Sequence, residues 1–431
     1  MVPKLIAHHH PADAGLSADG PSAHSRLDRW LLEKIYQSVG RPAIRLALEN
    51  GPVVSPEDSR PVATLRFRNR KTLFGLILDP DSGFGDAYSD GRITVEGDLV
   101  AALEEFHRTT PPFESQNWYT RAVSRCLAFA QRNSLRGAHS NIHRHYDLSN
   151  DFFRLWLDPQ LSYSCAYFPS ASMTIEEAQA AKMDYICRKL NLQPGERLVD
   201  VGSGWGALAL HMARHYGVTV RGYSISREQV VWARRRAQEL GLDQRIEFIQ
   251  DDYRSISGKY DAFVSVGMLE HVGAEHYRQM GRVIHRLLEG SGRGLLQVIG
   301  RNQPRPFSNW VHKHIFPGAY APSLRQVMDI FEPWNFSILD VENLRLHYAR
   351  TLQCWLERFE DAASVVSAQF GPKFVNTWRL YLAGSIAGFR AGALQLFQVV
   401  FARGNYRALH PTRAHLYSEE GQKEHAAVAV V

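Results

Sequence analysis

The segment ERLVDVGSGWGALAL, residues 196–210, constrains the fold more than any other part of this chain. Its short apolar run predicts a buried strand, and Gly202, Gly204 and Gly206 follow that strand directly. Glycines at this point allow the backbone to turn tightly and to approach a bound ligand before a helix begins. The segment therefore predicts the first strand–turn–helix unit of an α/β domain with a ligand at the turn.

Strands and helices alternate on either side of this turn. The patterns predict helices at 174–192, 207–216, 227–241 and 275–290. They alternate with the predicted strands VTVRGYS, RIEFIQ, YDAFVSVG and GLLQVIG. Thr174, with Glu177 three residues later, has the pattern of a capping box at the start of the first helix. Such alternation predicts a mostly parallel sheet with helices on both faces, and a ligand beyond the carboxyl ends of the strands.

The composition divides the chain into four parts. Residues 1–25 are rich in His, Ala, Ser and Pro and are predicted to be disordered. Residues 26–135 predict a small α+β domain, in which ATLRFRNRKTLFGLILD has the alternation of a hairpin and DPDSGFGDAYSDG the composition of a loop. Residues 136–405 hold the α/β domain, which is predicted to become helical in its last part, up to about residue 402. Residues 406–431 are predicted to form a flexible tail.

The location of the protein is predicted from its apolar stretch and its cysteines. Residues 380–402 are long enough to span a bilayer, but Arg390 lies near their middle, where it costs about 2.5–3.5 kcal/mol. A buried or amphipathic helix is therefore expected there. The N-terminus has no apolar region of the kind found in secretory signals, and the four cysteines are not closely paired. A reducing, cytoplasmic location is expected, with neither a disulfide framework nor a metal site.

The glycine turn suits two classes of ligand. A dinucleotide favours G-x-G-x-x-G and an acidic residue near the end of the second strand. Here the spacing is G-x-G-x-G, position 207 is Ala, and no acidic residue follows the second strand until Glu228. S-adenosylmethionine has no phosphate and needs polar groups around its ribose and adenine. Asp200, Ser224, Gln229 and the pair Asp251–Asp252 follow the strands at suitable points, so S-adenosylmethionine is the predicted ligand.

The segment LSYSCAYF, residues 161–168, places Cys165 among aromatic and small residues. Three interpretations remain open from the residues alone. The thiol packs in a core, it is a nucleophile, or it belongs to a backbone turn at a site. A nucleophilic thiol needs a histidine or a helix N-terminus nearby to lower its pKa.

A set of segments in this chain resembles the cyclopropane fatty acid synthases and mycolic acid cyclopropane synthases. The segments are HYDLSNDFF, LSYSCAYF, VDVGSGWG, SISREQ, DYR, VSVGMLEHVG, NWVHKHIFPG and AGFRAGALQLFQVVFAR. They occur in order over residues 145–403, and the smaller domain before them is similar to the one in bacterial lipid-modifying members. The resemblance implies a Rossmann-like class I methyltransferase domain, with helical C-terminal insertions that form an acyl pocket.

The resemblance also implies a reaction. The methyl group of S-adenosylmethionine passes to a cis double bond of an acyl chain, usually in a phospholipid. A carbocation results, and a base removes a proton from the added methyl group so that a cyclopropane ring closes. A bound bicarbonate ion is the implied base. Such chemistry requires an apolar, water-free pocket, and aromatic faces can stabilise the cation.

The resemblance assigns roles to particular residues. The bicarbonate ion would be held by Cys165, Glu270, Tyr381 and the backbone of Ile299, so Cys165 would not be a nucleophile. The expected cofactor residues are Tyr163, Ser164, Asp200, Gly202, Gly204, Gly206, Ser224, Gln229, Asp252 and Tyr253.

Gln297 departs from the family pattern, which has a histidine two residues before the isoleucine of the last matched strand. A glutamine amide donates a hydrogen bond but carries no charge. Either Gln297 still holds bicarbonate and a ring forms, or the cation loses another proton. The second route gives a methylene-branched or methyl-branched chain, or a furan precursor.

The expected partners follow from this reaction and from the charge. The net charge is +6, and the basic run RFRNRK includes Arg66, Arg68, Arg70 and Lys71, which would attract anionic headgroups. A peripheral protein at the inner face of the membrane is expected, the resemblance implies a homodimer, and no nucleic-acid recognition motif is visible. Two other functions stay open: an N- or O-methyltransferase of small molecules, and a lipid- or cofactor-binding protein without turnover.

Overall fold

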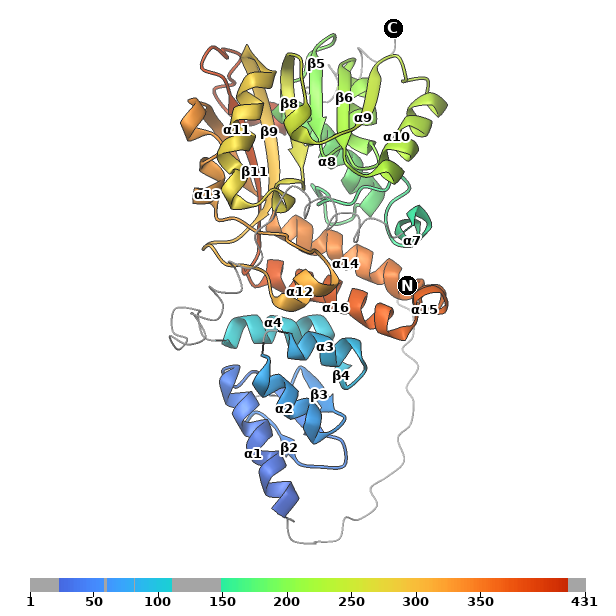
Figure 1. Ribbon diagram of the computed structural model, residues 1–431, viewed down its shortest axis with the longest axis vertical. Coiled ribbons are helices and arrows are strands. Elements are labelled where there is room, and N and C mark those ends of the chain that lie inside the picture. Colours follow the sequence, from blue (N-terminus) through green and yellow to red (C-terminus); the bar gives the residue numbers. More distant parts are fainter. Residues whose placement is uncertain (1–22, 58–59, 81, 111–148, 418–431) are drawn as a thin grey trace.

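The computed structural model describes residues 23–57, 60–80, 82–110 and 149–417, and these form two sheets joined by a layer of helices (Figure 1). The larger sheet has seven strands in the order β10-β11-β9-β8-β5-β6-β7. Its strands are β5 (Arg197–Val201), β6 (Thr219–Ser224), β7 (Ile246–Gln250), β8 (Tyr260–Val266), β9 (Leu288–Gly300), β10 (Ser337–Asn343) and β11 (Gln395–Ala402). Strands β5 to β9 pair in parallel, and β11 runs antiparallel to both of its neighbours.

Helices cover both faces of the larger sheet, which confirms the predicted α/β fold. On one face lie α8 (Ile175–Lys189), α9 (Ala207–Tyr216) and α10 (Arg227–Glu239). On the other lie α11 (Tyr277–Leu287) and α13 (Leu324–Met328). The capping box is also confirmed, because the Thr174 side chain accepts from the Glu177 backbone while the Glu177 carboxylate accepts from that of Thr174.

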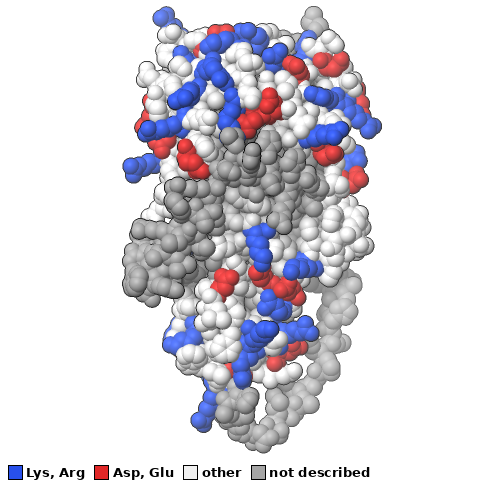
Figure 2. Space-filling model, in the orientation of Figure 1, with Lys and Arg blue, Asp and Glu red and all other residues white. Residues whose placement is uncertain are grey.

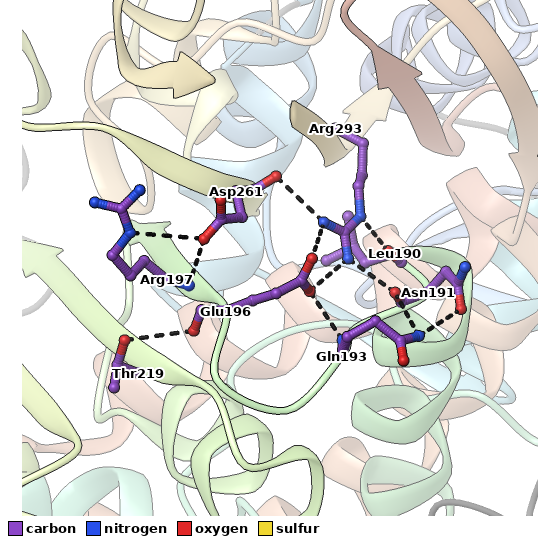
Figure 3. A network of polar contacts seen from close by, with 8 residues as sticks. All are labelled: Leu190, Asn191, Gln193, Glu196, Arg197, Thr219, Asp261 and Arg293. Carbon is purple, nitrogen blue, oxygen red and sulfur yellow. Dashed lines mark hydrogen bonds and ion pairs between the residues drawn. The ribbon is translucent and has the colours of Figure 1, made fainter. Parts of the chain in front are cut away.

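A buried arginine forms a network of polar contacts at the amino ends of β5 and β8, opposite the glycine turn (Figure 3). Arg293, within β9, is 4 % exposed and binds both carboxylate oxygens of Glu196 at 2.6 Å. The same guanidinium donates to the backbone oxygens of Leu190, Asn191 and Asp261. It thus ties β9 to the end of α8 and to the strands β5 and β8.

A helical layer lies below the carboxyl ends of the parallel strands (Figure 1). Its helices are α7 (Asn150–Arg154), α12 (Asn309–His314), α14 (Arg345–Asp361), α15 (Ala363–Phe370) and α16 (Pro372–Arg390). Large rings fill its interior, with Trp156 in edge contact with Trp355 and Trp378 at 5.6 and 5.8 Å between centroids. We call the buried apolar core of this layer the aromatic cluster. Besides the three tryptophans it includes Phe152, Phe153, Cys165, Trp205 and Tyr381.

The apolar stretch 380–402 is not one helix, so that expectation is wrong for its second half. Helix α16 ends at Arg390, and residues 395–402 form β11, which is buried along its whole length between β9 and β10. The apolar run reflects a strand covered on both faces. Within the part of the chain that the structure describes, no helix is long and apolar enough to cross a membrane.

The smaller domain has a four-stranded sheet in the order β2-β1-β3-β4. Its elements are α1 (Ala23–Ser38), β1 (Ile44–Leu48), β2 (Val53–Val54), β3 (Ala63–Phe67), α2 (Arg70–Leu78), α3 (Gly83–Ser89), β4 (Ile93–Gly97) and α4 (Leu99–Thr109). The predicted hairpin is wrong, since only β3 is a strand and Asn69 then caps α2 by accepting from Thr72 N–H at 3.1 Å. The predicted loop contains α3.

Acidic side chains of the smaller domain pair with basic side chains of the helical layer. Asp86 on α3 accepts from Lys313 at 2.9 Å and lies 2.7 Å from a ring nitrogen of His314 on α12. At the same contact Gly85 lies against Trp310, and a Cβ at position 85 would be 2.4 Å from the indole ring. The close approach explains why this helix carries a glycine here.

Part of the predicted C-terminal tail contacts the larger domain. Within residues 406–417, Leu416 is buried and its carbonyl oxygen accepts from Arg188, and Arg413 pairs with Asp340 of β10. Residues 407–414 are exposed, and the flexible tail stays a prediction. Residues 418–431 and most of the predicted disordered N-terminus lie outside the described residues, as does the start of the HYDLSNDFF segment.

Candidate active site

A cavity of about 180 Å³ opens at the carboxyl ends of β5 and β6, where the glycine turn lies. We call it the turn cavity. The expected cofactor residues that line it are Tyr163, Ser164, Asp200, Gly202, Gly204, Ser224, Gln229, Asp252 and Tyr253. Gly206 does not line it. Gly206 instead precedes α9 with φ +87°, and a Cβ there would lie 2.6 Å from the ring of Phe248, so its role is close packing of helix on sheet.

The glycine turn is fixed by the neighbouring strand. The backbone N–H groups of Gly202 and Ser203 both donate to the carbonyl oxygen of Tyr223, at 2.9 and 3.0 Å. Gly202 and Gly204 have φ of +87° and +55°, in the left-handed region that glycine adopts without strain. A side chain at position 202 would also meet Met268 at 2.9 Å. The turn therefore exposes backbone to the cavity.

Polar side chains at or after the ends of β6 and β7, and one from α10, surround the rest of the turn cavity. The Ser224 hydroxyl donates to the Gln229 side-chain oxygen at 2.9 Å, which fixes the orientation of that amide. The Asp252 carboxylate accepts from the Arg254 guanidinium at 2.6 and 2.7 Å. Asp252 is therefore held by a cation of this chain, whereas its neighbour Asp251 also lines the cavity and is exposed.

The segment 161–168 forms the wall between the turn cavity and the helical layer. Asp158 holds its start by accepting from the backbone N–H groups of Gln160 and Ser162, at 3.0 and 2.8 Å. The Gln179 side chain of α8 donates to the carbonyl oxygens of Ser162 and Ser164. Sequence reasoning did not single out Asp158 or Gln179, since a polar residue in a loop or on a helix is ordinarily solvated.

Two buried charged groups face the turn cavity. Asp200, at the end of β5, is 2 % exposed, and burial raises the pKa of its carboxyl to about 7. Lys182 of α8 is 4 % exposed and donates to the Ser164 hydroxyl at 3.0 Å. Sequence reasoning missed Lys182, because the helical pattern alone does not show that α8 is buried on the side that carries it.

Glu270 follows β8 in a short 3₁₀ helix, Leu269–His271, and is 5 % exposed. One carboxylate oxygen accepts from the Ile299 backbone N–H at 2.6 Å, and the other has no hydrogen-bond partner. Burial raises the pKa of this carboxyl to about 7. A buried acid that is half protonated near neutral pH can donate or accept a hydrogen bond, which marks it as a candidate functional group.

Cys165 and Tyr381 lie in the aromatic cluster, against which Ile299 packs. The Cys165 thiol donates to the Ala166 carbonyl oxygen at 3.1 Å, and burial raises its pKa. A thiol in such surroundings stays protonated and is not a nucleophile. The Tyr381 hydroxyl lies 2.8 Å from that of Tyr163, which lines the turn cavity. The cluster and the cavity therefore share a wall.

Gln297 lies on β9 two residues before Ile299 and is 2 % exposed. Its side-chain oxygen accepts from Gln398 on the paired strand β11 at 2.8 Å. Gln398 in turn accepts from Lys189 of α8, at 2.8 Å. Gln297 does not line the turn cavity, and its observed bond runs across the sheet to β11.

The glycine turn, the parallel sheet and the turn cavity define an S-adenosylmethionine-dependent methyltransferase, and comparisons with known proteins agree. The mycolic acid cyclopropane synthetase family matches residues 133–399, so the chain belongs to that family. The cyclopropane-fatty-acyl-phospholipid synthase of Escherichia coli K12 is 41 % identical over 270 residues, which are 62 % of this chain and 69 % of the relative.

Two further relatives extend the comparison. The tuberculostearic acid methyltransferase of Mycobacterium tuberculosis is 36 % identical over 381 residues, which cover 84 % of this chain and 88 % of the relative. A mycolic acid cyclopropane synthase solved with SAH and CTAB is 33 % identical, with a TM-score of 0.59 over 61 % of this chain and 98 % of that one. The chain is thus a fatty acid or phospholipid methyltransferase of the cyclopropane synthase family.

Proposed function

We propose that this enzyme transfers the methyl group of S-adenosylmethionine to a cis double bond of an unsaturated acyl chain in a membrane phospholipid, and that a cyclopropane ring forms. The observation that carries this proposal is the wall shared by the turn cavity and the aromatic cluster. Tyr163 and Trp205 belong to both, because each lines the cavity and packs in the cluster. A hydrocarbon held among these rings would lie next to the methyl donor in the turn cavity.

The aromatic cluster suits a cationic reaction on a hydrocarbon. Ring faces attract positive charge, and a dry pocket prevents water from trapping the cation. Trp156 and Trp355 both lie within 5.3 Å of Tyr163 between ring centroids, so several rings surround the tyrosine at the shared wall. The name of the Escherichia coli relative, a fatty-acyl-phospholipid synthase, supports an acyl substrate of this kind.

Four residues from different elements, which contact one another or pack together near the end of β9, would suit a small anion such as bicarbonate. We call Cys165, Glu270, Ile299 and Tyr381 the candidate anion site. Glu270 has an unpartnered buried oxygen, and its raised pKa of about 7 leaves a proton that the carboxyl can donate. The Tyr381 hydroxyl is a second donor. A bound bicarbonate ion would supply a base, while the residues of this chain fix its place and exclude water.

A second product stays open because of Gln297. Its side-chain oxygen is engaged by Gln398, so it contributes at most its amide N–H₂ to the candidate anion site. If the anion is held less firmly there, a hydride shift can move the cation to the methylated carbon, and loss of a methyl proton then gives a methylene-branched chain. Loss of a proton from a chain carbon gives a methyl-branched chain or a furan precursor instead. The likeness to the tuberculostearic acid methyltransferase supports testing this branch.

The smaller domain is the part that we expect to meet an anionic membrane. Among the predicted basic residues, Arg66 pairs with Glu96 and Arg70 with Asp28, whereas Arg68 and Lys71 are exposed. Figure 2 shows Lys and Arg side chains spread over the lower part of the molecule, where this domain lies. Binding to anionic vesicles that weakens as salt rises would support this role. The homodimer and the placement at the inner face of the membrane stay predictions.

The experiment that tests the proposed function uses two kinds of vesicle. The enzyme is incubated with methyl-labelled S-adenosylmethionine and phosphatidylglycerol whose chains are either cis-monounsaturated or fully saturated. The proposal predicts label in the fatty acids of the unsaturated vesicles alone. Label in both lipids, or only in headgroups, would contradict it, and cofactor binding without label in either would favour a binding protein.

A further inference from the structure

The turn cavity holds a buried ammonium group, that of Lys182, which makes no direct ion pair with the described residues. The Lys182 ammonium is 4 % exposed, and its hydrogen bond goes to the neutral hydroxyl of Ser164 at 3.0 Å. The carboxylates of Asp158 and Asp200 attract it through space. Removing an ammonium group from water costs several kcal/mol unless an anion compensates it. The turn cavity thus contains a buried ammonium group whose charge is compensated only through space, without a direct ion pair among the described residues.

The carboxylates nearest to Lys182 do not remove this imbalance. Asp158 is occupied by the backbone N–H groups of the loop that it holds, at 2.8 and 3.0 Å. Asp200 attracts Lys182 through space, but one of its own oxygens is buried without any hydrogen-bond partner. Burial lowers the pKa of Lys182 and raises that of Asp200, so both groups are poorly solvated as they stand.

The cavity therefore presents one positive and one negative group that each need a partner. A ligand with a carboxylate and an ammonium group a few bonds apart would satisfy both. The α-amino acid part of S-adenosylmethionine has this pair of groups, whereas its adenosine part has neither. The glycine turn lies between the ends of β5 and β6 beside them, which is where the proposed function places this cofactor.

We propose that Lys182 binds the carboxylate of the amino acid part of S-adenosylmethionine, opposite Asp200, which faces its ammonium group. The inference rests on the proposed cofactor role of the turn cavity and assigns a residue that makes the cavity selective for a nucleoside bearing an amino acid. Ser164 positions the ammonium group of Lys182 through their hydrogen bond. Because α8 is anchored at its start by the capping box, the lysine is held by a rigid element.

A different role for Lys182 would place its charge on the other side of the wall, next to Cys165. The two side chains do interact through space, since the lysine lowers the pKa of the thiol against the larger effect of burial. In that case Lys182 would stabilise an anion in the candidate anion site. Cofactor affinity would then not depend on the lysine, so binding measurements separate the two roles.

The test compares two cofactors and uses calorimetry on the full-length protein. S-adenosylmethionine carries the carboxylate, and decarboxylated S-adenosylmethionine lacks only that group. Lys182→Met removes the charge and keeps the length of the side chain, and Lys182→Gln keeps a donor without the charge. Lys189→Met is the matched control, because Lys189 is buried on the same helix but pairs with Glu342 outside the cavity.

The expected result is selective. Lys182→Met and Lys182→Gln weaken S-adenosylmethionine binding about 10- to 100-fold, the range of a lost charge-assisted hydrogen bond, and change binding of the decarboxylated cofactor less than about threefold. The control variant leaves the ratio of the two affinities unchanged. Equal losses for both cofactors, or no loss for either, would overturn the inference.

Two further readouts keep the test decisive. The wild-type protein itself must prefer S-adenosylmethionine over the decarboxylated cofactor by about tenfold or more, which is measurable even if a variant folds poorly. Thermal unfolding of Lys182→Met should occur no lower than in wild type, because the variant loses a buried unpaired charge. If the wild-type protein binds neither cofactor, the proposed function of the cavity fails, which is a separate result from loss of selectivity.

Discussion

Glu270→Gln should make the protein more stable at alkaline pH while it removes most of its activity. The substitution keeps the size of the side chain, and the amide oxygen can still accept from the Ile299 N–H that Glu270 now binds at 2.6 Å. The variant lacks the buried carboxyl group, whose ionisation at high pH destabilises the folded wild type.

The magnitude follows from the pKa of this carboxyl. Burial raises it from the ordinary value of 4.5 to about 7. Well below pH 4.5 the group is protonated in both the folded and the unfolded chain. The free energies of unfolding of wild type and variant then differ by an amount that does not change with pH. Between pH 4.5 and 7 the unfolded chain ionises first, and the folded wild type loses stability as the pH rises. Each pKa unit is worth about 1.36 kcal/mol, so the loss is about 3 kcal/mol in total.

The assay is urea unfolding of both proteins at several pH values from 4 to 9, followed by tryptophan fluorescence. The free energy of unfolding of Glu270→Gln minus that of wild type should rise by about 3 kcal/mol across this range and level off above pH 8. Asp200, whose pKa is also near 7, titrates in both proteins and cancels in the difference.

Activity provides the second half of this prediction. Methyl transfer by Glu270→Gln should fall about 10²-fold or more, in the range of a lost acid–base group. S-adenosylmethionine affinity should stay within about twofold, because Glu270 does not line the turn cavity. Parallel stability curves for the two proteins, or full activity in the variant, would refute the reasoning about this carboxyl.

Three further substitutions test other parts of the structure. Tyr381→Phe removes a hydroxyl of the candidate anion site and should lower product formation about 10-fold or more with cofactor affinity unchanged in calorimetry. Arg293→Met removes a buried guanidinium from the network of Figure 3, so the half-buried Glu196 carboxylate loses its cation and three backbone carbonyl oxygens lose a donor, and it should cost about 3–5 kcal/mol in urea unfolding. Gly85→Val should collide with Trp310 and increase hydrogen exchange in α3 and α12, while Gly75→Ala, where a Cβ meets nothing within 4 Å, should not.

Much of the fold could be predicted because periodicity, glycine turns and caps are local signals. The strand–glycine–helix unit around Gly202 and the capping box at Thr174 depend on residues close together in sequence. The errors arose where tertiary contacts override the pattern. The alternating run after Phe67 becomes helical because Asn69 caps α2, and residues 395–402 become a strand because β9 and β10 flank them.

The candidate site was predictable to a similar extent. Residues near strand ends, such as Asp200 and Ser224, follow from the rule that parallel sheets bind ligands at that edge. Gly206 shares the motif but packs on Phe248, a distinction that requires the distance across the sheet. The burial of Lys182 depends on which face of α8 packs against the rest of the protein. The hydrogen bond between Gln297 and Gln398 depends on which strand pairs with β9, and local sequence patterns predict neither.

The central claim is that this enzyme adds a methyl group to an acyl double bond and that a base then removes a proton from that methyl group. The most direct measurement supplies S-adenosylmethionine with a trideuterated methyl group and cis-monounsaturated phosphatidylglycerol, then weighs the fatty acid product. The account predicts a chain that keeps two deuterium atoms and no longer reacts with ozone, as expected of a ring. A saturated or unsaturated methyl-branched chain that keeps all three would contradict it, because the proton would then have left another carbon or no proton would have been lost.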